Sequence, residues 1–172
     1  LILDAVTPSA RPSLRLLHLE DSELDHELAM AQLKRAGWSF TVCRVDSGAA
    51  FQEALELPWD AILSDYNLPG YTGLQALDYV RRRSLDIPFL LVSGEIGEDM
   101  AVQAMRKGAS DYLLKSNLAR LAPAMEHAIE ACESRRARFA ADAEVARSRQ
   151  QLSELAQHLQ TSVEMERAAI AR

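Results

Sequence analysis

Five short apolar runs alternate with stretches that have the spacing of amphipathic helices, and this pattern limits the fold more than any other feature. Strands that alternate with helices are typical of right-handed βαβ units, in which helices cover both faces of a parallel sheet. The sequence therefore predicts an α/β domain with a doubly wound, five-stranded parallel sheet. The expected strands cover residues 14–19, 40–45, 61–64, 88–92 and 110–114, and the expected helices cover residues 22–36, 48–57, 73–83 and 98–107.

The end of the chain has a different pattern. Residues 124–172 contain no glycine or proline and are rich in Ala, Glu, Arg, Gln and Leu, which predicts one long helix. Residues 118–132 have the apolar spacing of a helix that packs on the sheet. Residues 152–170 continue an apolar seam that the domain cannot cover, so we expect a dimeric coiled coil or a helical bundle. A solvated or folded-back helix stays open, because residues 135–149 are rich in arginine.

Composition excludes several classes of protein. The chain has 19 basic and 25 acidic residues and a net charge of -6, so we expect no direct binding to nucleic acid and no attraction to anionic membranes. No apolar run approaches the roughly 20 residues that span a bilayer. Cys43 and Cys132 are too few for a disulfide framework or a zinc site, which favours a reducing, cytoplasmic location.

Polar residues follow four of the five expected strands. Glu20 and Asp21 follow the first, Asp65 the third and Ser93 the fourth, and the fifth runs into Lys115. Because the carboxyl ends of parallel strands share one edge of the sheet, these side chains should converge there.

The residue types at this edge indicate a chemistry. Converging carboxylates repel one another unless a hard cation lies between them, and Mg²⁺ prefers oxygen ligands. A metal, Lys115 and Ser93 together could bind a phosphoryl group. Asp65 is the best candidate nucleophile, because the following turn with Pro69 and Gly70 should leave its carboxylate exposed.

Residues 14–132 resemble a receiver domain of two-component signalling, and residues 1–13 are expected to be a disordered or tag-like segment. The resemblance implies a flavodoxin-like sheet of strand order 2-1-3-4-5. It rests on four segments at strand ends, namely residues 20–21, 64–70, 92–94 and 111–115.

The resemblance also implies a role for each polar residue at this edge. Asp65 would accept a phosphoryl group from a histidine kinase or a phosphotransfer protein, with Mg²⁺ as cofactor. The implied metal ligands are Asp21 directly, Glu20 through water, Asp65, and the main-chain carbonyl of Asn67, while Ser93 and Lys115 contact the phosphoryl group and Tyr112 is the aromatic switch.

The sequence departs from the family pattern at two positions. Glu20 replaces the first aspartate of the usual acidic pair, and its longer side chain still reaches the metal. Ser116 follows Lys115, where the family commonly has a proline in a cis peptide. A cis bond before a non-proline residue costs about 2.5 to 4 kcal/mol, so either the loop bears that cost or it differs.

The last seven residues, 166–172, resemble the start of the dimerization and phosphotransfer helix of one class of histidine kinases. We therefore expect residues 133–172 to be a helical linker or coiled coil that leads to a missing output domain. The chain would be the regulatory, homodimeric part of a hybrid histidine kinase, without its ATP-binding domain. The alternative is a stand-alone response regulator that acts through protein-protein contacts. An aspartyl-phosphate hydrolase is a weaker alternative, because Asn67 stands where such enzymes carry a second aspartate.

Overall fold

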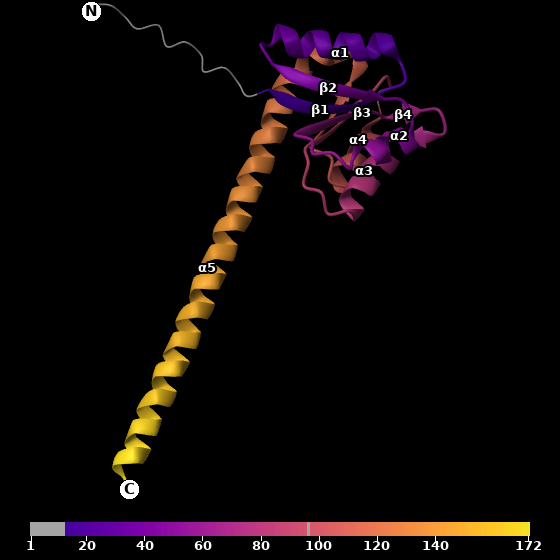
Figure 1. Ribbon diagram of the computed structural model, residues 1–172. Helices are drawn as coiled ribbons and strands as arrows, with labels where there is room; N and C mark the ends of the chain where they lie inside the picture. The colour runs from indigo at the N-terminus through magenta and orange to yellow at the C-terminus, as the bar shows by residue number, and fades with distance from the viewer. Residues whose placement is uncertain (1–12, 96) are drawn as a thin grey trace, which may run out of the picture. The chain divides into compact units, whose positions relative to one another are not determined.

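A computed structural model describes residues 13–95 and 97–172, so the expected segment 1–13 lies outside the description except for Ser13. The chain forms two compact units, one that ends at Cys132 and one that covers Glu133–Arg172. In the first unit, a five-stranded parallel sheet has the order β2-β1-β3-β6-β7. Figure 1 labels β2, β1 and β3 of this sheet. Its strands are β1 (Leu14–Leu19), β2 (Phe40–Val45), β3 (Ala61–Asp65), β6 (Phe89–Ser93) and β7 (Asp111–Leu114).

This order confirms the predicted doubly wound sheet. Strands β4 (Asn67–Leu68) and β5 (Tyr71–Thr72) form a separate antiparallel hairpin, where the sequence indicated only a turn. The helical elements are α1 (Glu23–Arg35), α2 (Gly48–Ala54), α3 (Gly73–Arg82), α4 (Glu98–Arg106), the 3-10 helix η1 (Lys115–Arg120) and α5 (Leu121–Ile170).

Helices cover both faces of the sheet because successive strand residues point in opposite directions. Leu16 belongs to the core cluster formed with α1 and the first turns of α5, whereas Leu17 belongs to the cluster formed with α2, α3 and α4. Both side chains are fully buried. The two cores hold the carboxyl ends of the strands in a fixed arrangement.

Helix α1 begins and ends where the sequence predicts. The Ser22 side chain caps it by accepting a hydrogen bond from the Asp25 backbone N–H, at 3.2 Å. Gly37 follows with φ of +82°, a left-handed conformation that glycine adopts at little cost.

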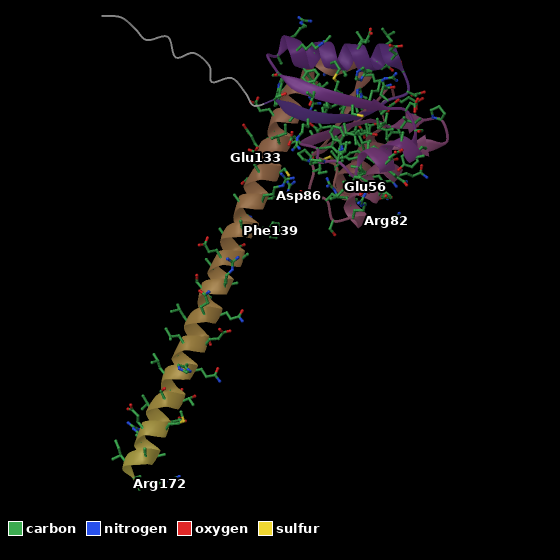
Figure 2. The ribbon with its side chains drawn as sticks, in the orientation of Figure 1. Glu56, Arg82, Asp86, Glu133, Phe139 and Arg172 are labelled. Carbon is green, nitrogen blue, oxygen red and sulfur yellow. The ribbon has the colours of Figure 1, made fainter. Side chains whose placement is uncertain are left out.

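The predicted start of the C-terminal helix, at residue 118, is three residues early. Residues 115–120 form η1 instead, and Asn117 has non-helical angles inside it, φ −134° and ψ 53°. From Leu121 the helix is continuous to Ile170, and side chains project from all sides of it between Glu133 and Arg172 (Figure 2). Leu152, Leu155 and Leu159 of the predicted seam are exposed. Within the part of the chain described, no helix is long and apolar enough to cross a membrane.

Candidate functional site

Three carboxylates meet at the carboxyl edge of the sheet, as the strand ends predict. Glu20 and Asp21 follow β1, and Asp65 is the last residue of β3; the parallel register places Leu19 beside Ser64, so the two strand ends are level. One oxygen from each carboxylate lies within 4.8 Å of the others. Glu20 and Asp65 are buried and Asp21 is exposed. Of the three carboxylates, Asp21 is therefore the one that solvent reaches most easily.

Lys115 lies against this cluster. Its ammonium donates to Asp65 Oδ2 at 3.0 Å and to Asp25 Oδ2 at 2.7 Å, and it lies 3.2 Å from Glu20 Oε2. The described peptide bonds are all trans, so the loop at Ser116 differs from the family pattern and turns directly into η1. Lys115 nevertheless reaches the site.

Asp25 is the residue that the sequence reasoning missed. It lies in the first turn of α1, where acidic residues are common because their negative charge interacts favourably with the positive end of the helix dipole. Its spacing therefore gave no sign of a contact with Lys115, which lies 90 positions further along the chain.

Burial and the neighbouring charges shift the pKa values of two side chains at the site. Burial raises the pKa of Glu20, and the negative charge of Asp65 acts in the same direction, against the Ser22 N–H and the Lys115 ammonium. Burial alone would lower the pKa of Lys115, but hydrogen bonds to Asp25 and Asp65 and the attraction of nearby carboxylates raise it above its usual value. Lys115 is therefore a cation at neutral pH, and three carboxylates surround it.

Asp65 is buried, which corrects the expectation that the following turn leaves its carboxylate exposed. Only 8% of its side chain is accessible. The chain does not turn away from the site after β3, because the Gly73 N–H donates to the carbonyl of Tyr66 at 2.9 Å and brings α3 back against the strand end. The backbone N–H of Asn67 donates a hydrogen bond to Asp65 Oδ1, with 3.4 Å between the nitrogen and the oxygen.

Ser93 and Tyr112 are linked through one residue. Ser93, the fully buried last residue of β6, accepts a hydrogen bond on Oγ from the Glu95 N–H at 3.2 Å. The Tyr112 hydroxyl donates to the Glu95 carbonyl at 3.4 Å. The ring of Tyr112 also packs edge-on to Tyr66, with 6.3 Å between centroids. These contacts join the ends of β3 and β6 to the middle of β7.

The fold and the site define an α/β domain whose acidic, lysine-bridged edge has the ligand chemistry for a hard cation and a phosphoryl group. The chain belongs to the response regulator receiver domain family, which matches residues 16–126. Receiver domains take phosphoryl groups from histidine kinases or phosphotransfer proteins. The predicted family is confirmed.

Individual relatives agree with this assignment. The response regulator protein FleR of Pseudomonas aeruginosa is 36% identical over 102 residues, which are 59% of this chain and 21% of FleR. The crystal structure of full-length FixJ from B. japonicum is 30% identical with a TM-score of 0.62, covering 70% of this chain and 59% of that one. The beryllofluoride-activated NtrC4 receiver domain dimer is 26% identical with a TM-score of 0.60, covering 69% of this chain and 98% of that one. The chain thus spans about a fifth of the length of FleR.

Proposed function

We propose that this chain is a phosphoacceptor that receives a phosphoryl group from a histidine kinase or phosphotransfer protein on Asp65, with Mg²⁺ as cofactor. The observation that carries the proposal is the Lys115 ammonium in contact with Asp65 and Glu20, beside the exposed Asp21. This set offers a hard cation several oxygen ligands and offers a phosphoryl group a fixed positive charge.

The oxygen donors fit Mg²⁺ in kind and spacing. Asp21 and Asp65 would hold it directly, Glu20 through water, and Asn67 through its main-chain carbonyl. When bound, the metal supplies positive charge that offsets the phosphoryl oxygens.

In the transfer, a carboxylate oxygen of Asp65 bonds to phosphorus while the bond from phosphorus to the donor's imidazole nitrogen breaks. The electron pair of that bond stays on the imidazole, and Asp65 becomes an acyl phosphate. Lys115 and Ser93 would each contact a phosphoryl oxygen. Ser93 would then move toward the phosphoryl group, and the change would pass through Glu95 to Tyr112.

Labelling with a small phosphodonor tests the assignment of Asp65. With Mg²⁺ and acetyl phosphate, the intact mass should show one added phosphoryl group, and Asp65→Asn should abolish it because the amide is not a nucleophile of this kind. Asp78→Asn on α3, which pairs with Lys107, is the matched control and should label normally. Undiminished labelling of the Asp65 variant would sink the assignment.

The wider context is a further part of the proposal. Residues 14–132 would be the receiver, and residues 133–172 a dimerizing helical linker to the output part of a hybrid histidine kinase, with a cytoplasmic location. Its support is the kinase-like pattern of residues 166–172. A kinase requires a phosphorylatable histidine and a nucleotide-binding domain after Arg172, so the sequence encoded there decides the point.

A stand-alone response regulator that acts through protein contacts is the second candidate. The names of this chain's relatives, such as the response regulator FleR and the transcriptional activator PfeR, support a response regulator rather than a kinase, and the matches cover 21% and 33% of those two proteins. A sequence after Arg172 that lacks both kinase features would support this candidate instead.

A further inference from the structure

The shortest contact of the Lys115 ammonium is with Asp25, a residue outside all four family segments. The Lys115 Nζ to Asp25 Oδ2 distance is 2.7 Å, compared with 3.0 Å to Asp65 Oδ2 and 3.2 Å to Glu20 Oε2. An ammonium has three N–H donors, so these three carboxylates account for all of them.

Two of the three carboxylates that contact Lys115 also belong to the proposed metal site. Glu20 and Asp65 belong to the acidic cluster whose oxygens would bind a cation, and Asp65 is also the proposed nucleophile. A bound cation and Lys115 therefore compete for the same two carboxylates. Asp25 is not a member of that cluster, so its bond to Lys115 is the one that metal binding and phosphorylation leave in place.

Both ends of this ion pair are fixed by the fold. The backbone N–H of Asp25 is held by the Ser22 cap in the first turn of α1, and Lys115 is the first residue of η1. Helix α1 packs against η1, which keeps the carboxylate and the ammonium opposite each other. The pair is only partly shielded, with 34% of the Asp25 side chain and 24% of the Lys115 side chain accessible, so its effect should be moderate.

We infer that Asp25 is a positioning residue. It holds the Lys115 ammonium at the phosphoryl site while Glu20 and Asp65 serve as ligands of the metal. The inference rests on the proposed function of Asp65. Without Asp25, Lys115 would rest on Asp65 and Glu20 alone, where it blocks the nucleophile and opposes the metal.

The first test compares two acidic residues of the same helical turn. Asp25→Asn keeps the side-chain volume and the Ser22 cap, and the rate of Asp65 labelling by acetyl phosphate with Mg²⁺ should fall about three- to tenfold, the usual effect of losing a charge-assisted hydrogen bond that is partly screened. Glu23→Gln removes the same charge from an exposed position and should leave the rate within about twofold. Asp25→Glu restores the carboxylate and should recover most of the rate. A rate for Asp25→Asn equal to or above that of Glu23→Gln overturns the inference.

The second test asks whether Asp25 acts through Lys115. By calorimetry, Asp25→Asn should weaken Mg²⁺ binding more than Glu23→Gln does, because Lys115 then competes more strongly for Glu20 and Asp65. In the Lys115→Met background, Asp25→Asn and Glu23→Gln should have equal effects on Mg²⁺ affinity. An excess effect of Asp25→Asn that persists without Lys115 overturns the positioning role. Absence of labelling in the unsubstituted chain would instead contradict the proposed function, so the two failures are distinguishable.

Discussion

Two histidines pack against each other beside the acidic site. His18 is buried in β1, and its Nδ1 lies 2.8 Å from Nδ1 of His26 on α1. Burial lowers the pKa of His18 to about 3, and the charges of His26, Lys115 and Arg44 act in the same direction. His18 is therefore neutral in the folded chain at neutral pH. One of the two nitrogens must donate and the other accept, as in a pair of neutral tautomers.

This histidine makes stability depend on pH. In the unfolded chain the pKa of His18 returns to about 6.5, so between about pH 6.5 and 3 the unfolded state binds more protons and the free energy of unfolding falls as the pH falls. The slope from one such group is at most about 1.4 kcal/mol per pH unit. Urea unfolding of His18→Gln should show a shallower slope between about pH 6 and 4. The control is His158→Gln on the exposed part of α5, and equal slopes for the two variants would contradict the prediction.

Among the elements, α3 depends on a glycine at its first position. A Cβ at Gly73 would press into the Leu91 side chain and lie 2.5 Å from the Asp65 carbonyl oxygen. The close approach brings the helix start against the strand end that carries the proposed phosphoacceptor. Larger residues would push these two elements apart.

Gly73→Ala should therefore lower the free energy of unfolding by about 1 to 3 kcal/mol, the usual cost of overpacking a core. Gly94→Ala is the matched control, because a Cβ there meets no atom within 4 Å and its φ is not positive. Denaturant unfolding measures both variants. If the Gly73 variant were as stable as the Gly94 variant, the close contact would not limit this position.

For the whole molecule, local patterns were sufficient to predict the sheet. The five apolar runs placed the strands, and level strand ends followed from parallel pairing, so Glu20, Asp65 and Lys115 could be expected at one edge. The hairpin of β4 and β5 was not predictable, because two residues per strand leave no alternation to detect.

Contacts between distant parts of the chain could not be predicted from the sequence. The run 81–83 has the composition of a solvated helix end, yet Arg81 donates to the carbonyl of Gly108, which lies 27 positions further along the chain. The ion pair of Asp25 and Lys115 is of the same kind. Neither pairing has a spacing rule, since each depends on how separate elements pack.

The unit that ends at Cys132 should fold without the rest of α5. The buried residues of α5 end at Cys132, and residues from Glu133 onward are exposed. Deletion of residues 134–172 should keep cooperative unfolding and the labelling of Asp65. If the exposed seam forms the proposed dimer, light scattering should show a dimer for the full chain and a monomer for the deletion. A monomeric full chain would remove the dimer proposal.

A pair of substitutions separates the seam from the rest of the helix surface. Leu159→Glu should dissociate the dimer, because it places a charge in the apolar stripe. Phe139→Glu makes a similar change at an exposed residue on the opposite side of the helix and should leave the dimer intact. Equal effects of the two variants on the measured mass would contradict a seam at Leu159.

The link between Ser93 and Tyr112 uses only main-chain atoms of Glu95, its N–H and its carbonyl. The residue type at position 95 can therefore change in evolution without altering this connection. Proline is the exception, because it has no N–H and would delete the half that reaches Ser93. Sequence comparisons that track side-chain identity would thus overlook position 95, although the connection between a buried hydroxyl and an aromatic ring passes through it.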